Sequence, residues 1–258
     1  MEAPLIIVTN DDGIDSPYLS LLAAHLKQTL GAEVLVVAPE RQRSAMSHAI
    51  TLHKPLRIRE QRPGFYSLSG SPVDCVYVAC LHLAKRTPAL VISGPNDGFN
   101  LGTDVFYSGT VGAAVEGGLR GIPSIAVSVD RDSASVVPMA ARLVGQLATQ
   151  MMQAPLPTGT VLNVNVPTGA TQAVWTNIGR RFYEDDVHER TDPRGGKYIW
   201  IGGGIAGIAE VPGTDCYAVV RDGHASITPL QLDPTRHELV GATQPDWDLG
   251  NFAKGSES

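Results

Sequence analysis

Two consecutive carboxylates, Asp11 and Asp12, stand directly after an apolar run and directly before Gly13. The apolar run, residues 5–9, is typical of a buried strand. Aspartate and glycine tolerate the backbone angles of a turn, so the segment is compatible with a simple change of chain direction. It is equally compatible with two negative charges held at a strand end to bind a cation. The segment by itself leaves both interpretations open.

Two further polar segments follow later apolar runs and offer oxygen atoms of other kinds. PERQRSAMSHA contains Ser44, and GPNDGFNLG contains Asn96. In open α/β sheets, ligands bind beyond the carboxyl ends of the strands, so both segments are expected to meet Asp11 and Asp12 there. A set of carboxylate, hydroxyl and amide oxygens suits a hard cation such as Mg²⁺, Mn²⁺ or Ca²⁺. No cluster of histidines and cysteines competes with it, which argues against structural zinc.

A second kind of site is indicated where Ser108, Gly109 and Thr110 open a helix rich in alanine and glycine. Hydroxyl groups and free backbone N–H groups converge at such a helix start, and the helix dipole favours negative charge there. Asn100, earlier in the same segment, is a candidate for positioning a phosphate or an attacking water. A metal beside an anion cradle is the arrangement that hydrolysis of a phosphate ester requires.

The elements that must position these residues alternate between strand and helix patterns. This alternation predicts an α/β fold with a Rossmann-like, mainly parallel sheet and helices on both faces. We expect residues 1–170 to form this core with the metal and phosphate sites, and residues 171–258 to form a C-terminal, β-containing extension used for pairing subunits. The patterns predict strands over 5–9, 34–38, 90–93, 125–129, 161–166, 197–201 and 225–230, and helices over 17–30, 73–84, 110–119, 135–152 and 214–221.

Composition narrows the classes of function. The net charge of −6 over 258 residues argues against a nucleic-acid binder that works through a basic surface. No window approaches the roughly 20 apolar residues of a membrane span, and we expect neither a membrane partner nor a signal peptide. Cys75, Cys80 and Cys216 form no C-x-x-C pair, which favours a reducing compartment. The expected location is the cytoplasm.

Four segments together resemble the SurE family of stationary-phase survival proteins. They are TNDDGIDSP, APERQRSAMSH, SGPNDGFNLGTDVFYSGTVGAAVEG and TDCYAVVRDGHASITPL, in that order, and the resemblance covers about residues 5–235. It implies a divalent-metal-dependent nucleotidase that hydrolyses nucleoside 5′- and 3′-monophosphates. It also implies homodimers or homotetramers that exchange C-terminal elements. Two departures, Ser71 for the usual threonine and His224 for a common aromatic residue, leave the metal site untouched but bear on substrate preference.

The resemblance also implies which residues hold the metal: Asp11, Asp12, Ser44 and Asn96. We expect one divalent cation per subunit, Mg²⁺ or Mn²⁺, beside a phosphate held by Asn100, Ser108, Gly109 and Thr110. The catalytic residues are expected to be Asp11 and Asp12, one of which could act as general base. The substrate is expected to be a nucleotide, with short polyphosphate as a possible second substrate.

Three alternatives stay open at this point. In an aspartyl-phosphate phosphatase one aspartate would be the nucleophile, although that class uses D-x-D where this chain has D-D. A dinucleotide-binding dehydrogenase is disfavoured, because the turn after the first strand lacks G-x-G-x-x-G. A non-catalytic protein that binds a metal or nucleotide is the third.

Overall fold

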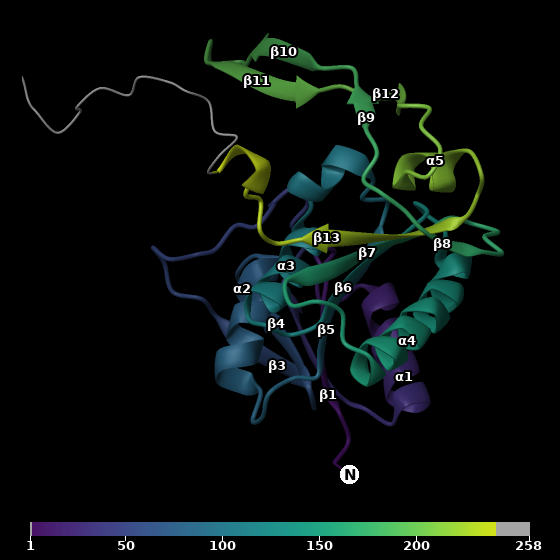
Figure 1. Ribbon diagram of the computed structural model, residues 1–258. Helices are drawn as coiled ribbons and strands as arrows, with labels where there is room; N and C mark the ends of the chain where they lie inside the picture. Colours follow the sequence, from purple (N-terminus) through teal and green to yellow (C-terminus); the bar gives the residue numbers. More distant parts are fainter. Residues whose placement is uncertain (1, 241–258) are drawn as a thin grey trace, which may run out of the picture.

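A nine-stranded sheet runs through the middle of the computed structural model, which describes residues 2–240 (Figure 1). The strand order is β3-β4-β2-β1-β5-β6-β7-β13-β8. The neighbouring strands from β4 to β7 pair in parallel, whereas β3 and β13 run antiparallel to β4 and β7. The strands are β1 (Leu5–Thr9), β2 (Glu33–Pro39), β3 (Ile58–Arg62), β4 (Phe65–Leu68), β5 (Leu90–Asp97), β6 (Ser124–Val129), β7 (Thr160–Val166), β8 (Ala173–Trp175) and β13 (Ala225–Gln231).

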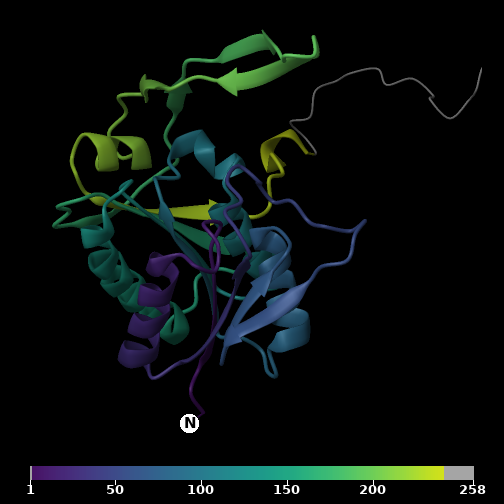
Figure 2. The same cartoon turned by 180° about the vertical axis from the view of Figure 1, so that it is seen from behind.

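Helices cover both faces of this sheet (Figures 1 and 2). Alternate side chains of β1 point to opposite faces, as a strand requires. Ile6 and Val8 therefore pack in the core beneath α1 and α4, whereas Leu5 and Ile7 pack beneath α2 and α3. The predicted α/β class with helices on both faces is confirmed. The helices are α1 (Pro17–Leu30), α2 (Pro72–Val78), α3 (Gly109–Leu119), α4 (Val137–Gln153) and α5 (Asp215–Val220).

Short helical turns complete the connections. The predicted helix over 73–84 is observed as α2 followed by a π-helical turn, Ala79–Leu83. Single 3₁₀ turns lie at Gly102–Phe106, Ala134–Val136 and His237–Leu239. No helix in the described part of the chain is long and apolar enough to cross a membrane.

The predicted strand over 90–93 is longer than expected. It continues through Gly94 and Pro95, residues typical of turns, and pairs Asn96 with Ser128 of β6. Asn96 therefore lies near the carboxyl end of a central strand rather than in a loop, and the sheet fixes its position. Strands β3, β4 and β8 were not among the predicted elements, because β3 is polar and exposed, β4 has only four residues and β8 only three.

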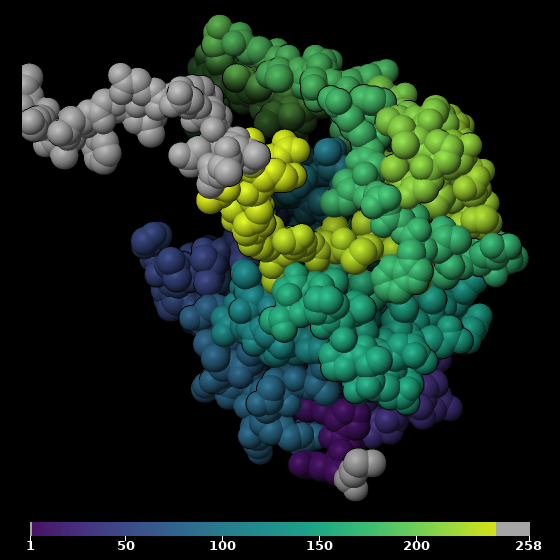
Figure 3. All heavy atoms as spheres, viewed as in Figure 1, coloured from purple at the N-terminus to yellow at the C-terminus, as the bar shows by residue number. Residues whose placement is uncertain are grey.

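The chain after residue 170 is divided between the sheet and a projection from it. Strands β8 and β13 join the central sheet, so the sheet continues across the predicted boundary. Residues 181–208, which we call the arm, form two small antiparallel pairs and stand off from the body (Figures 1 and 3). The division into 1–170 and 171–258 stays a prediction, and its part from residue 241 lies outside the described residues. The strands of the arm are β9 (Arg181–Tyr183), β10 (Asp186–Thr191), β11 (Lys197–Gly202) and β12 (Ile205–Ile208).

One buried carboxylate joins the C-terminal part to the core. Asp215, the first residue of α5, is fully buried and accepts a hydrogen bond from the Gly102 N–H at 2.8 Å and another from the Gly179 N–H at 2.7 Å. It also accepts from the Cys216 N–H. The Asp215 side chain is therefore the acceptor for N–H groups from three segments of the chain, around residues 102, 179 and 216.

Asp215→Ala is expected to lower the free energy of unfolding by roughly 3 kcal/mol, because it leaves buried donors without acceptors. Urea denaturation measures the change. Asp222→Ala is the matched control: it removes the same charge from an exposed position after α5 and should alter stability by less than about 0.5 kcal/mol. Equal stability of the two variants would contradict this role of Asp215.

Candidate metal and phosphate site

The turn after β1 is built by residues other than the two aspartates. The Asn10 side chain donates to the Gly13 carbonyl at 2.9 Å and accepts from the Gly13 N–H at 3.1 Å. Gly13 has a φ of 101°, and a Cβ there would lie 3.1 Å from the backbone of Arg41. Asn10 and Gly13 thus form the turn, and the carboxylates of Asp11 and Asp12 are free for another role.

Asp11 is withdrawn from water. Its residue surface is 5% exposed, and its Oδ1 accepts a hydrogen bond from the Thr110 hydroxyl at 2.5 Å. Burial raises the pKa of Asp11 from 3.8 to about 6; the neighbouring charge of Asp12 adds to this, and the Thr110 hydroxyl works against it. A carboxylate in this state gains strongly from a nearby positive charge.

Asp12 lies at the same strand end in a less enclosed position. Its Oδ2 accepts a hydrogen bond from the Asp97 N–H at the end of β5, at 3.1 Å. Burial raises its pKa above the ordinary value, while that N–H works in the opposite direction. The hydrogen bond ties Asp12 to the residue that follows Asn96, so three of the four predicted metal ligands meet where β1 and β5 end.

The amide of Asn96 is oriented by its own loop. Its Nδ2 donates to the Gly98 carbonyl at 2.6 Å, which leaves the side-chain oxygen as the group available to a cation. Ser44 is exposed. The residue before it, Arg43, donates its backbone N–H to the Asp11 carbonyl at 2.7 Å. The loop after β2 therefore runs directly beside Asp11. Within residues 2–240 no group of three or more His, Cys, Asp or Glu side chains is placed to hold a metal, so a cation at Asp11 and Asp12 would take its other ligands from amide, hydroxyl, backbone carbonyl or water oxygens.

Of the predicted phosphate residues, Gly109 and Thr110 at the start of α3 lie against Asp11. Ser108 is the N-cap of α3, and its hydroxyl accepts from the Val111 N–H at 3.1 Å. A Cβ on Gly109 would lie 3.2 Å from the Asp11 carboxylate, so glycine lets the helix start approach that closely. The hydroxyl of Thr110 is directed at Asp11, a direction that its sequence position did not reveal. Thr110 therefore contacts a predicted metal ligand rather than standing open to a phosphate.

Asn100 is held by a buried polar network that the sequence patterns did not indicate. Its Nδ2 donates to the Ser128 hydroxyl at 2.8 Å, and its N–H donates to Asn165 Oδ1 at 2.8 Å. Its carbonyl accepts from Asn163 at 2.8 Å and from Asn165 at 3.1 Å. The sequence pattern that could have indicated this network is VLNVNV, which has two asparagines inside an otherwise apolar strand. Buried amides need hydrogen-bond partners. These residues fix the loop that leads from β5 towards α3.

Comparison with known proteins agrees with this architecture. A family model described as "Survival protein SurE" matches residues 6–185. The 5′-nucleotidase SurE of Pelobacter propionicus is 48% identical over 90% of this chain and 95% of its own length. That of Anaeromyxobacter sp. strain Fw109-5 is 43% identical over 96% of this chain and 98% of its own.

A solved structure shows the same likeness in three dimensions. The crystal structure of the SurE protein from Aquifex aeolicus matches with a TM-score of 0.79 and 36% sequence identity, covering 92% of this chain and 97% of that one. The family model spans residues 6–185, and each of these similar proteins covers 90% or more of this chain. The chain belongs to the SurE survival protein family.

Proposed function

We propose that this chain is a divalent-metal-dependent 5′-nucleotidase that releases phosphate from nucleoside monophosphates. The observation that carries the proposal is the pair of adjacent carboxylates, Asp11 buried and Asp12 partly buried, beside the N-terminus of α3. A cation bound by the carboxylates would offset their negative charge and would attract a phosphate held at the helix N-terminus, which itself favours negative charge. The names of the similar proteins, 5′-nucleotidase SurE, support the same activity.

The donor set fits a hard cation. Asp11, Asp12, Ser44 and Asn96 offer only oxygen atoms, and the raised pKa of both carboxyl groups indicates that they lack sufficient positive compensation in the chain itself. A bound Mg²⁺ or Mn²⁺ would neutralise charge on the phosphoryl group and lower the pKa of a bound water. We propose one such cation per subunit.

The remaining roles follow from what each group of the chain can donate or accept. The N–H of Gly109 lies in the first turn of α3, where it has no intrahelical acceptor, and would hold a phosphate oxygen. The backbone of Thr110, like its hydroxyl, contacts the Asp11 carboxylate. Asn100 has committed one Nδ2 hydrogen to Ser128, which leaves its second N–H and its side-chain oxygen to orient the attacking water. One of the two aspartates, Asp11 or Asp12, would act as the proton acceptor.

The substrate range is a finer part of the proposal. We propose nucleoside 5′-monophosphates as substrates, with 3′-monophosphates and short polyphosphate to be compared in one phosphate-release screen. Trapping of a phosphoenzyme would favour an aspartyl-phosphate mechanism instead. Metal and nucleotide binding without turnover would favour a non-catalytic protein.

We also propose that subunits pair through the arm. Phe182, Tyr198 and Trp200 are each more than 40% exposed, and Ile201 is 89% exposed. Exposed apolar side chains gathered on a projection are typical of a protein interface. Folding back onto the same subunit would have buried them, and it does not occur. A homodimer or homotetramer in the cytoplasm is the proposed state; the free cysteines Cys75, Cys80 and Cys216 suit a reducing compartment.

Removal of divalent cations with EDTA is expected to abolish phosphate release from nucleoside monophosphates, and added Mg²⁺ or Mn²⁺ to restore it. The physical reason is that within residues 2–240 neither Asp11 nor Asp12 forms an ion pair that could replace the cation. A colorimetric phosphate assay measures the rate. Full activity of the metal-stripped protein would refute the mechanism.

Thr110→Val is expected to weaken Mn²⁺ binding mainly at low pH. Loss of the hydroxyl removes an interaction that lowers the pKa of Asp11, so that pKa should rise by about one to two units above its value of about 6. At pH 6 the cation must then displace a proton, and affinity should fall about tenfold; at pH 8 the fall should be about twofold or less. Calorimetric titration with Mn²⁺ at both pH values measures this.

Thr110→Ser keeps the hydroxyl and is the matched control for that experiment. Equal Mn²⁺ affinities of Thr110→Val and wild type at pH 6 would remove Thr110 from the metal site. If kcat/KM nevertheless fell, the hydroxyl would act on phosphate, as the sequence alone suggested.

Trp200→Asp and Ile201→Asp, made together, are expected to convert the oligomer into monomers, because each places a charge in an apolar contact of the arm. Light scattering at micromolar concentration measures the mass. Leu52→Asp, at an exposed apolar residue outside the arm, should leave the mass unchanged. A monomeric wild-type protein would contradict the proposed interface.

A further inference from the structure

The 3₁₀ segment Gly102–Phe106 lies between two parts of the proposed site. On one side it holds the loop that carries Ser44: the Ser47 N–H donates to the Tyr107 carbonyl at 2.9 Å, and the Ser47 hydroxyl donates to the Phe106 carbonyl at 2.6 Å. These two bonds are made three residues beyond Ser44. The position of that loop therefore depends on the position of the 3₁₀ segment.

On its other side the segment leads directly into α3. The Asp104 carbonyl accepts from the Tyr107 N–H at 2.9 Å and from the Ser108 N–H at 3.1 Å. Ser108 is the N-cap of α3, and Thr110, in the first turn, contacts Asp11. A shift of Asp104 would therefore move both the helix start proposed to bind phosphate and the hydroxyl that contacts the proposed metal ligand.

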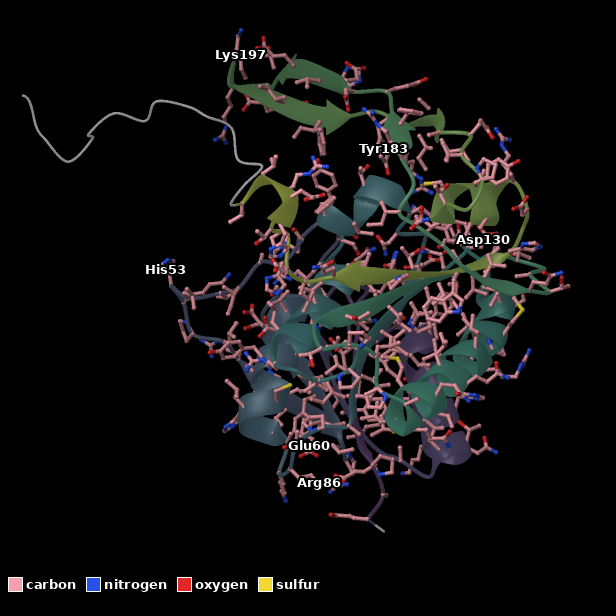
Figure 4. The ribbon with its side chains drawn as sticks, viewed as in Figure 1. His53, Glu60, Arg86, Asp130, Tyr183 and Lys197 are labelled. Carbon is pink, nitrogen blue, oxygen red and sulfur yellow. The ribbon has the colours of Figure 1, made fainter. Side chains whose placement is uncertain are left out.

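The side chain of Asp104 is held by two residues of the arm. Arg181 Nη1 lies 2.5 Å from Asp104 Oδ2, and the Tyr183 hydroxyl donates to Oδ1 at 2.6 Å. Both residues belong to β9, where a period of two places them on the same face. Figure 4 shows Tyr183 at the foot of the arm, far from Lys197 at the tip.

This contact is strong enough to fix Asp104. The side chains of Arg181 and Asp104 are 9% and 12% exposed, so removal of either charge would leave the other poorly solvated. Partial burial and then the hydrogen bond to Asp104 raise the pKa of Tyr183 above its ordinary value, which keeps the hydroxyl protonated as a donor. Both contacts join residues that are more than 70 positions apart.

We propose that Arg181, together with Tyr183, is a positioning residue for the hydrolytic site. Their hold on Asp104 fixes the 3₁₀ segment, and through it the loop of Ser44 and the start of α3. The foot of the arm thus has a role in the geometry of the site that is separate from any contact made by its exposed tip. The effect on turnover rests on the proposed nucleotidase activity, whereas the effect on the two loops does not.

Arg181→Met tests the proposal, with Arg180→Met as the matched control. Arg180 is exposed and stacks over Phe182, so its replacement removes the same charge one position away without touching Asp104. Tyr183→Phe is the milder variant, which deletes only the hydroxyl, and Arg181→Lys tests rescue of the charge. Three quantities are measured well below the melting midpoint of each variant: amide hydrogen exchange of residues 44–50 and 104–110, Mn²⁺ affinity, and kcat and KM for a nucleoside monophosphate.

Arg181→Met is expected to speed exchange in both segments about tenfold while α1 stays unchanged. The value of kcat should fall about tenfold or more, since small displacements of reacting groups are costly, with a smaller change in KM. Tyr183→Phe should show the same pattern more weakly, Arg181→Lys should recover part of it, and Arg180→Met should match wild type.

A lower melting temperature with unchanged exchange and kinetics in Arg181→Met and Tyr183→Phe would show a merely structural role and overturn the proposal. A wild-type protein that releases no phosphate would instead refute the proposed function. The exchange and Mn²⁺ measurements would then still decide whether Arg181 positions the two segments.

Discussion

Two adjacent carboxylates at the end of β1, one buried and one partly buried, are the constraint on which the rest of the site depends. The pKa of Asp11 is about 6 rather than 3.8, so ionising it costs about 3 kcal/mol more in the folded chain than in the unfolded chain. Because the folded pKa is the raised one, stability from the protonated form is present below about pH 4 and is lost as the pH rises through about 6. At neutral pH the metal-free fold therefore carries a strain that a bound cation would relieve.

The neighbouring elements hold the two carboxylates in place but do not fully offset the cost of burying them. Asn10 and Gly13 make the turn, Gly109 lets α3 approach, and Asp97 and Thr110 donate hydrogen bonds to the carboxylates. The hydrogen bonds from Asp97 and Thr110 stabilise the ionised forms, yet both pKa values stay raised. The structure thus keeps the two carboxylates close and under-compensated, which is the condition for binding a small cation tightly.

Much of this arrangement was predictable from local pattern. Continuous apolar runs identified β1, β2 and β5, and the polar segments after them pointed to the carboxyl edge of the sheet. Strand β3 was missed because its five residues are all exposed, so its pairing with β4 leaves no apolar signature. The direction of the Thr110 hydroxyl and the contact between Arg181 and Asp104 were equally hidden. Each depends on how two elements far apart in sequence approach one another, and neither segment carries that information alone.

The central claim is that the Asp11 carboxyl group is kept out of water in order to hold a cation. Carbon-13 NMR of the Asp11 carboxyl carbon, titrated with and without saturating Mg²⁺, measures its pKa directly. The account predicts a pKa of about 6 in the metal-free protein and a fall of about two units or more with Mg²⁺. A pKa that stays near the ordinary value in the metal-free protein, or that does not respond to Mg²⁺, would contradict it.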